Sequence, residues 1–484
     1  MRFIVVGAGA AGCVVAARLS EYPNNDVLLI EAGPDRVPET RTAALTSLNW
    51  IDAFDDPEAV DTNIMASRVP GEPVRPYVRG IGVGGSGAIN GMVCLAGLSR
   101  DYDRWASDFE CREWSWRNVE PWFARMKSEL MEASRRHFTV IDNAMWSAAE
   151  GLGIPAGIDT YGNDDGIGLA YLSASPTGRR STAQGLLDRA RTSTGITVLE
   201  GARVSHVIVT GGRARGVHLA DGRRMDADHV VVCAGALESP AILLRSGLTH
   251  PGIGRNLRDH PSVRFDLSVR SESPRRRAGE PSTNVVMRSS SSVGTGDLQL
   301  LPMFRQGSHG ATMAGLLVAA MTVESAGEVT IDPANPLGPP RVEMNMLSAP
   351  RDVTALRDGV RLASRALACP AFSELAPDEG ALDVMRELQR GGSVSDDWIR
   401  DRTGDYFHAS GTCRMGAESD SEAVVDTHGS VLGLQGLHVI DTSVFPQIPS
   451  ANTYWPVVVV AERLTAGLMG RSLGEVPVWP VDDA

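Results

Sequence analysis

A chain of 484 residues is longer than one hydrophobic core usually supports, so two domains are expected. Its net charge of -13 argues against nucleic acid or an anionic membrane as a partner, because a polyanion would repel it. The six cysteines stand without C-x-x-C pairs, which argues against a disulfide framework and a zinc site. These numbers favour an enzyme that acts on small molecules in a reducing compartment.

The start of the chain bears on where the protein works. A predicted strand begins almost at Met1, which leaves no space for the charged and apolar regions of a secretory signal. The longest apolar runs, such as residues 457–461, fall well short of the roughly eighteen residues that a membrane-spanning helix needs. A cytoplasmic protein with no membrane partner is therefore predicted.

The first glycine cluster lies between a predicted strand and a predicted helix. Residues 3–6 are apolar, Gly7, Gly9 and Gly12 follow at G-x-G-x-x-G spacing, and apolar residues then recur at helical period. Gly7 permits the tight turn, Gly9 lets a pyrophosphate approach the backbone, and Gly12 lets the helix pack close to the strand. The helix N-terminus would then face the phosphates of a dinucleotide.

A second apolar strand, residues 27–30, ends at Glu31, where a carboxylate can accept hydrogen bonds from the ribose hydroxyls of an adenosine. Because strand, glycines, helix and acid all agree in spacing, dinucleotide binding is favoured over three glycines that merely punctuate a turn. The motif alone leaves NAD and FAD open.

Residues 33–71 are polar and rich in proline, and they are predicted to form a loop with short helical pieces. A second glycine-rich segment follows at residues 78–93, VRGIGVGGSGAINGMV, and then DYDRW at residues 101–105. So much glycine costs conformational entropy, which indicates that something approaches this backbone closely. A mobile surface loop would explain the glycines, but not NGMV together with DYDRW.

The two stretches resemble the first signature of the glucose-methanol-choline (GMC) family of FAD-dependent oxidoreductases. This resemblance implies that residues 84–93 cover the pyrophosphate and the flavin edge of FAD. Some family members attach FAD covalently through a histidine in this segment, where this chain has Ile89. Noncovalent FAD is therefore implied.

Between residues 177 and 219 the chain returns to the predicted FAD domain. Residues 177–196, TGRRSTAQGLLDRARTSTGI, are similar to the family's Arg-Ser-Thr segment that precedes this return. Strands are predicted around the turn signal Gly211-Gly212, at residues 196–199, 204–209 and 216–219. The resemblance implies that the strand containing Val204 contacts the adenine.

A buried strand at residues 229–234 runs into GALESPAILLRSG, residues 235–247, which resembles the second GMC signature. The resemblance implies that Gly235 lies against the cofactor. Residues 254–261, GRNLRDHP, are similar to the family's N-L-x-D-H-P element. There the resemblance implies that His260 belongs to the domain junction and not to the chemistry.

Residues 262–404 have the pattern of a different domain, and the resemblance is weaker there. An antiparallel sheet that roofs a substrate pocket above the flavin is predicted from strands at residues 263–269, 298–304, 316–323, 328–331 and 341–346. Helices are predicted at residues 352–367 and 383–390. The chain is shorter here than many relatives, which favours a bulky substrate such as a biosynthetic intermediate.

The last eighty residues carry the signal for chemistry. Residues 406–416, YFHASGTCRMG, resemble the family's Y-H-x-x-G-T-C-x-M-G element, with His408 at the position of the active-site histidine. Residues 450–456, SANTYWP, lead into a predicted helix at residues 457–469. Asn452 matches the second active-site position, where the family has histidine or asparagine.

Oxidising an alcohol with FAD needs a base for the hydroxyl proton, while the cofactor accepts the hydride. His408 is the predicted base, because a histidine can accept a proton at neutral pH. Asn452 cannot act as a base, but its amide can donate to the developing alkoxide. The sequence independently favours Asn452 as the N-terminal cap of the helix before Pro456, and both roles stay open.

Other side chains of this region have two possible roles. Tyr406, Phe407 and Trp455 are candidates for the pocket wall or for plain core. A strand within residues 431–446 ends in Asp441, and Asp441 and Thr442 are predicted to hydrogen-bond the pyrophosphate or ribityl region. The helix at residues 457–469 would point its N-terminus at the pyrimidine side of the flavin, where reduction places negative charge.

Together these segments predict an α/β chain, α+β overall, of the GMC oxidoreductase fold. A Rossmann-like FAD-binding domain is assigned to residues 1–110, 195–262 and 405–484, and a substrate-binding domain on an antiparallel sheet to residues 111–194 and 263–404. His408 and Asn452 are the predicted catalytic residues, and no metal is expected. The predicted FAD contacts are Gly7, Gly9, Ala10, Ala11, Gly12, Glu31, Ala32, Gly84, Gly85, Ser86, Asn90, Gly91, Met92, Val93, Val204, Ala234, Gly235, Asp441, Thr442 and Thr453.

The leading hypothesis is oxidation of an alcohol to an aldehyde or ketone, with hydride transfer to flavin N5 and with either O₂ or a carrier as electron acceptor. One alternative is redox-neutral chemistry, because the family is similar in sequence to hydroxynitrile lyases. A third hypothesis is a non-catalytic flavoprotein or a nicotinamide-binding module. The sequence leaves substrate identity, oxidase versus dehydrogenase activity and oligomeric state open.

Overall fold

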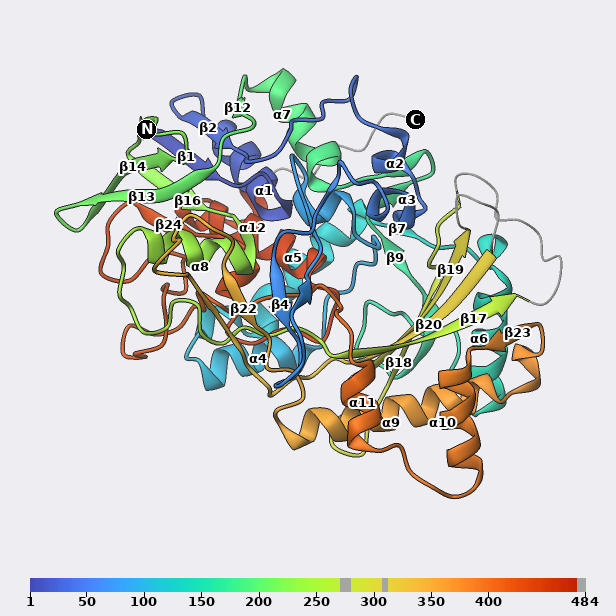
Figure 1. The fold of residues 1–484 in the computed structure, drawn as a ribbon. Helices are drawn as coiled ribbons and strands as arrows, with labels where there is room; N and C mark the ends of the chain where they lie inside the picture. The colour runs from blue at the N-terminus through green and yellow to red at the C-terminus, as the bar shows by residue number, and fades with distance from the viewer. Residues whose placement is uncertain (270–279, 307–311, 477–484) are drawn as a thin grey trace.

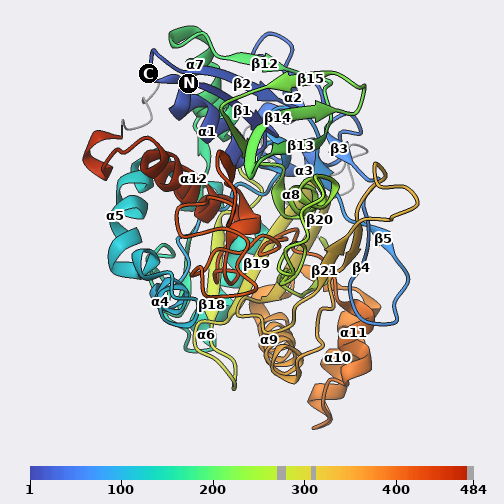
Figure 2. The same ribbon diagram turned by 90° about the vertical axis from the view of Figure 1, so that its left-hand side faces the viewer.

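The computed structural model describes residues 1–269, 280–306 and 312–476. Figures 1 and 2 show a parallel sheet with its helices, which includes the first strand of the chain, and a longer antiparallel sheet beside it. Helices α9, α10 and α11 lie on the outer side of the antiparallel sheet. Residues 270–279, 307–311 and 477–484 of the predicted domain ranges lie outside the described residues. Within the described ranges, no helix has both the length and the apolar character needed to cross a membrane.

The parallel sheet confirms the predicted Rossmann-like core. Four of its strands are largely buried apolar runs, as expected when helices and a second sheet cover both faces, whereas the edge strand at residues 197–199 is partly exposed. All four neighbouring pairs are parallel. The strand order is β12 (Thr197–Leu199), β2 (Asp26–Ile30), β1 (Arg2–Val6), β16 (His229–Val232) and β24 (Leu437–Val439).

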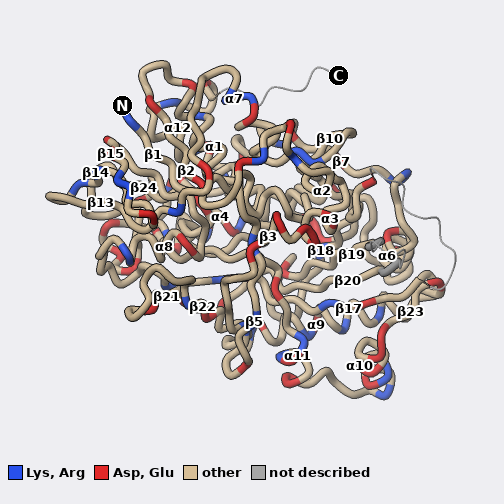
Figure 3. Tube along the Cα trace, turned by 45° about the horizontal axis from the view of Figure 1, so that its top comes forward, with Lys and Arg blue, Asp and Glu red and all other residues tan. Residues whose placement is uncertain are grey.

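Three helices begin near the carboxyl ends of these strands. They are α1 (Ala10–Ser20), α8 (Gly235–Arg245) and α12 (Tyr454–Leu468). Helices α1 and α12 pack together around a buried ion pair, in which Arg18 Nε lies 2.8 Å from Glu462 Oε2. Figure 3 shows that acidic and basic residues are also interspersed along the rest of the trace.

A three-stranded antiparallel sheet covers the parallel sheet beside β16. It consists of β13 (Val204–Thr210), β14 (Arg213–Leu219) and β15 (Arg224–Asp226). Gly211 and Gly212 form the two-residue turn between β13 and β14, with φ of +59° and +72°. Both angles favour glycine, and the turn predicted at these two residues is confirmed.

The antiparallel sheet has six strands in the order β23 (Leu375–Pro377), β17 (Ser262–Val269), β20 (Thr312–Ala320), β19 (Leu298–Gln306), β18 (Val285–Ser289) and β8 (Gly166–Leu169). Helix α9 (Pro350–Leu367) packs on one face, where Gly359 brings its backbone close to Val318 and Leu298. Alternate residues of β19 face the other side. That face is the one expected to roof a pocket.

One part of the predicted sheet is wrong. Strands β21 (Glu328–Thr330) and β22 (Arg341–Glu343) form a separate four-stranded sheet with β4 (Met65–Ser67) and β5 (Arg75–Pro76). Strand β22 pairs in parallel with β4, which lies in a segment predicted as loop. Alternation in a sequence indicates a strand but does not select its partner, which explains the error.

The remaining elements are short connections and covering helices. The helices are α2 (Ala43–Thr46), α3 (Trp50–Phe54), α4 (Ser99–Asp108), α5 (Trp116–Met126), α6 (Val140–Gly151), α7 (Asp188–Ser193), α10 (Glu379–Gln389) and α11 (Asp396–Arg402). The short strands are β3 (Val60–Asp61), β6 (Arg79–Gly80), β7 (Met131–Glu132), β9 (Tyr171–Leu172), β10 (Ala174–Ser175) and β11 (Gly178–Arg179). Phe123 of α5 shares its core with the parallel sheet. The domain boundaries drawn from the sequence stay a prediction.

Candidate active site

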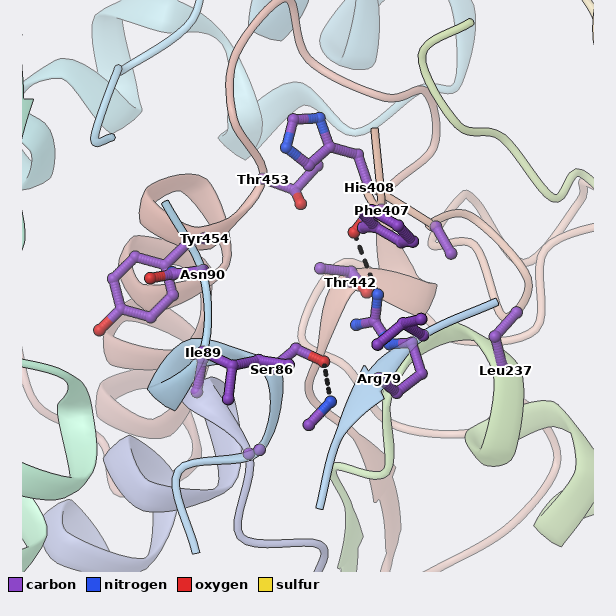
Figure 4. A pocket seen from close by; sticks show the side chains of 18 of the residues that line it. Arg79, Ser86, Ile89, Asn90, Leu237, Phe407, His408, Thr442, Thr453 and Tyr454 are labelled. Atoms are coloured by element: carbon purple, nitrogen blue, oxygen red, sulfur yellow. Dashed lines mark hydrogen bonds between the residues drawn. The ribbon is translucent and has the colours of Figure 1, made fainter. Parts of the chain in front are cut away.

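A cavity of about 1170 Å³ runs from the carboxyl ends of β1 and β16 to the inner face of the six-stranded sheet. In an open parallel sheet, this is the point where the strand order reverses and where ligands bind. All of the predicted site residues line the cavity except Gly12 and Gly84. Figure 4 shows part of this wall, including His408, Thr442, Thr453 and Asn90.

The two exceptions support the cavity from behind. A Cβ on Gly12 would lie 1.8 Å from the Gly7 carbonyl oxygen, so glycine is required for α1 to pack on the turn. Gly84 has a φ of +101°, and its N–H donates to the Ala8 carbonyl at 2.7 Å. This hydrogen bond holds the second glycine-rich segment, residues 78–93, against the turn that follows β1.

The residues at this end fit a dinucleotide. Nothing lies within 4 Å of the position that a Gly9 Cβ would take, although Gly9 lines the cavity, so glycine here leaves room for a ligand. The first N–H groups of α1 have no partner inside the helix and favour a phosphate. Glu31 accepts hydrogen bonds from the N–H groups of Ala8 and Gly33, at 2.8 and 2.9 Å, and lines the same cavity.

Asp441 braces the cavity wall. Its Oδ2 accepts from the Gly235 N–H at 2.8 Å and from the Ser239 hydroxyl at 2.6 Å, and its Oδ1 accepts from the Ser443 N–H. These bonds hold the glycine turn after β16 in place. A contact between Asp441 and FAD stays a prediction.

Asn90 is fixed by an arginine that the sequence predictions did not include. Arg179 Nη1 donates to Asn90 Oδ1 at 2.6 Å, and Arg179 Nη2 donates to the Asn90 carbonyl at 2.8 Å. Burial lowers the pKa of Arg179 to about 10. The only sequence feature that pointed to Arg179 is its place in residues 177–196, which are similar to the family's Arg-Ser-Thr segment.

At the other end of the cavity, His408 contacts a second histidine. Its Nδ1 lies 2.9 Å from Nδ1 of His260, and the two rings are nearly perpendicular at 89°. His260 is fully buried behind His408 and does not line the cavity. The sequence assigned His260 to the domain junction, and the 148 residues that separate the pair left no local pattern to reveal the contact.

Both histidines are neutral at neutral pH. Burial lowers the pKa of His408 well below 6.5, and the neighbouring His260 and Arg79 lower it further. Burial likewise lowers the pKa of His260 to about 3. A neutral imidazole has one nitrogen that donates and one that accepts, so one of the two Nδ1 atoms carries the shared proton.

The backbone around His408 is held by one carboxylate. Asp259 Oδ1 accepts from the N–H groups of His260 and His408, at 2.8 and 2.9 Å, and its Oδ2 accepts from the Tyr77 hydroxyl at 2.8 Å. Burial, with Asp405 nearby, raises the pKa of Asp259 to about 7. Phe407 has a φ of +63°, and its carbonyl accepts from Arg79 (Figure 4). Strained backbone of this kind persists only where its surroundings hold it.

Asn452 lines the cavity, but it is not the helix cap. Thr453 is the N-cap residue of α12, and no side-chain cap bond is formed there. The Asn452 Oδ1 instead accepts from Gln299 Nε2 at 3.4 Å.

The aromatic residues after Asn452 differ in place. Trp455 belongs to the core, with its Nε1 donating to the Tyr161 hydroxyl, whereas Tyr454 lines the cavity.

The cavity wall above these residues is mostly apolar. Leu301 and Met303 of β19 and Leu317 of β20 reach it from the six-stranded sheet, and Trp50 and Phe54 reach it from α3. The predicted roof from an antiparallel sheet is therefore present. The α3 aromatics were missed, because they lie in a segment that read only as loop with helical pieces.

Known proteins of similar sequence cover nearly all of the chain. Family models described as GMC oxidoreductase match residues 1–262 and 323–461. The chain is 31% identical to an uncharacterized GMC-type oxidoreductase of Rhodococcus erythropolis, covering 97% of this chain and 98% of that protein. It is 30% identical to a 5-(hydroxymethyl)furfural oxidase of Methylovorus sp., covering 97% and 99%.

Solved structures show the same fold. The pyridoxine 4-oxidase from Mesorbium loti matches with a TM-score of 0.83 at 22% identity, covering 97% of this chain and 99% of that one. A formate oxidase variant from Aspergillus oryzae, studied for FAD modification, matches with a TM-score of 0.82 at 22% identity, covering 97% and 98%. Since family models match both halves and relatives align from end to end, this chain belongs to the GMC oxidoreductase family and is an FAD-dependent oxidoreductase.

Proposed function

We propose that this protein oxidises the hydroxyl-bearing carbon of a small alcohol, with His408 as the base and Asn452 as the donor to the substrate oxygen. The observation that carries the proposal is that a neutral histidine lines the same cavity as the dinucleotide cradle and has its rear nitrogen bound to His260. Relatives named for 5-(hydroxymethyl)furfural and choline support an alcohol as the substrate class.

The cofactor end of the cavity would hold FAD through the turn at Gly7 and Gly9, the N-terminus of α1 and Glu31. Bound FAD supplies the hydride acceptor. Ile89 lines the cavity and offers no nucleophilic atom, so FAD is proposed to bind without a covalent bond. The first amides of α12 would favour negative charge close to Thr453.

The proposed role sets the proton positions in the buried histidine pair. For His408 to act as the base, its Nε2 must carry the lone pair, so its proton lies on Nδ1 and is donated to Nδ1 of His260, whose own proton is then on Nε2. His260 Nδ1 is then the acceptor, and His408 Nδ1–H donates to it. This leaves the lone pair on His408 Nε2 free to take the hydroxyl proton of a substrate.

Anaerobic mixing of the FAD-loaded protein with a panel of alcohols tests the proposal. At least one alcohol is expected to bleach the flavin absorbance in proportion to the enzyme. If no alcohol reduces the bound flavin, the proposal is wrong and redox-neutral chemistry becomes the better explanation. Reoxidation in air, with and without an artificial acceptor, then separates an oxidase from a dehydrogenase.

The variant His408→Ala is expected to keep FAD bound but to slow flavin reduction by about 10²–10⁴-fold, because the base is lost. Anaerobic stopped-flow absorbance measures the rate, and the visible spectrum of the purified protein reports bound FAD. His428→Ala is the control, since His428 is exposed and outside the cavity. Equal reduction rates in wild type and His408→Ala would refute the role of His408.

A further inference from the structure

The inner face of β19 carries one buried polar side chain next to the catalytic pair. Gln299 is 4% exposed, and it shares its face of the strand with Leu301 and Met303, which line the cavity. A buried amide is costly unless its polar atoms find partners. Gln299 does not line the cavity itself, so its partners are protein groups.

Those partners are Tyr406 and Asn452. The Tyr406 hydroxyl donates to Gln299 Oε1, and Gln299 Nε2 donates to Asn452 Oδ1 at 3.4 Å. Burial raises the pKa of Tyr406, and the neighbouring Asn452 side chain opposes this rise. The three side chains therefore form a chain of hydrogen bonds, with Gln299 of the six-stranded sheet at its centre.

The chain of hydrogen bonds has a direction. The Tyr406 hydroxyl donates its one hydrogen to Oε1, so the NH₂ end of the Gln299 amide faces Asn452. Because Gln299 Nε2 occupies the Asn452 carbonyl, the NH₂ group of Asn452 is turned toward Tyr406 and the cavity. An asparagine amide has nearly the same shape at both ends, so packing alone would not select this orientation.

We infer that Gln299 is a positioning residue, which holds the Asn452 amide with its NH₂ group toward the substrate oxygen. This inference rests on the proposed function. As the hydroxyl proton leaves, negative charge gathers on that oxygen, and a donor there stabilises it. A reversed amide would present its carbonyl to the same charge and repel it.

Two variants of similar shape test the inference in the FAD-loaded protein. Gln299→Met removes both hydrogen bonds and is expected to slow anaerobic flavin reduction about tenfold or more at every pH. Gln299→Glu keeps the acceptor for Tyr406, but an ionised carboxylate cannot donate to Asn452 Oδ1 and would turn the NH₂ group away from the substrate. Only its protonated form can restore the donor.

The glutamate variant therefore carries a pH signature. Its rate relative to wild type is expected to rise as pH falls from about 8 to 5, because burial raises the pKa of a carboxyl group. Three titratable or charged groups lie near position 299. They are Tyr406, the ring of His408 beyond Tyr406, and Arg288, which is the cross-strand neighbour of residue 299 on β18. Arg288 already donates to the carbonyls of Gly162, Asp164 and Thr160. A merely structural role for Gln299 predicts a pH-independent ratio, which would overturn the inference.

A double variant isolates the route of action. In an Asn452→Ala background, Gln299→Met is expected to cause no further loss, because the amide that it positions is gone. Full additivity of the two losses would contradict the inference. Gln447→Met is the matched control, since Gln447 is half-buried, lies outside the cavity and donates to the Val323 carbonyl; its rate is expected to equal that of wild type.

Acetate provides a readout that does not depend on turnover. It carries a negative charge but no hydride to transfer, and its binding is followed by the change in flavin absorbance. The Kd for acetate is expected to rise about tenfold in Gln299→Met, a loss of one charge-assisted hydrogen bond. If the wild-type protein oxidises no alcohol, the proposed function fails, and the acetate affinity still tests the role of Gln299. If the wild-type protein oxidises alcohols and Gln299→Met equals it in both rate and acetate affinity, only the inference fails.

Discussion

At the residue scale, the role proposed for His408 depends on a side chain that does not line the cavity. The Nδ1 atoms of His408 and His260 lie 2.9 Å apart and share one proton. In the proposed arrangement His260 accepts that proton, which leaves the lone pair of His408 on Nε2. Geometry and protonation thus come from the same buried neighbour.

The variant His260→Phe is expected to slow flavin reduction by about 10–100-fold, because His408 loses the acceptor that fixes its proton. His260→Gln should stay within a few-fold of wild type, since an amide oxygen can accept from His408 and its NH₂ group can face the Met321 and Pro449 carbonyls. Stopped-flow reduction rates of the two variants, with bound FAD checked by absorbance, measure the difference. Equal rates would show that His260 serves packing only.

At the element scale, the turn between β1 and α1 contains one glycine that the fold requires and another that leaves room for the ligand. Gly12 is required because a Cβ there would meet the Gly7 carbonyl at 1.8 Å. Gly9 has extended backbone with a φ of -71°, and open space beside it. Two glycines of one motif therefore serve two different purposes.

The pair Gly12→Ala and Gly9→Ala turns this difference into a measurement. Gly12→Ala is expected to destabilise the apoprotein by several kcal/mol, because the helix must move off the strand. Gly9→Ala should leave the apoprotein midpoint of thermal unfolding nearly unchanged but weaken FAD binding, since the new methyl group points into the cavity. Thermal unfolding of apoprotein and titration with FAD, followed by flavin fluorescence, measure the two effects. A Gly9→Ala protein with normal FAD affinity would argue against this cradle.

At the scale of the whole molecule, the active-site segment is tied to a distant sheet by Arg68. Its guanidinium binds Asp405 at both oxygens and donates to the carbonyls of Ala66, Arg75 and Pro76, while the side chain is 2% exposed. The four-stranded sheet and the segment of His408 are therefore joined by this clamp of an ion pair and hydrogen bonds. Asp405 also lines the cavity, so the clamp holds part of the cavity wall.

Replacing Arg68 with methionine is expected to destabilise the protein by about 3–5 kcal/mol, because the Asp405 carboxylate, whose side chain is only 12% exposed, loses its partner. Arg75→Met is the matched control, since the Arg75 side chain is 52% exposed and lies 3.4 Å from Glu72; a change within about 0.5 kcal/mol is expected. Urea unfolding of both variants measures these values. Similar unfolding free energies for the two would show that the clamp is dispensable.

These contacts also show which features were predictable. The turn at Gly7 follows from local patterns in the sequence, whereas the signature at residues 78–93 and the choice of His408 follow from the family resemblance. Residues of all three line the cavity, and their roles stay predictions. His260 and Gln299 were missed as site residues because their partners are 148 and 153 residues away. Contacts across such separations depend on strand pairing, which periodicity does not specify.

Asp259 has a consequence for how this family member can change over evolutionary time. Its carboxylate accepts from Tyr77 and from the backbone of two histidines, so an apolar residue there would leave three donors without this partner. Two of these donors are backbone N–H groups, which every residue except proline carries. No change of side chain at 260 or 408 to a residue other than proline therefore removes the need for an acceptor at position 259.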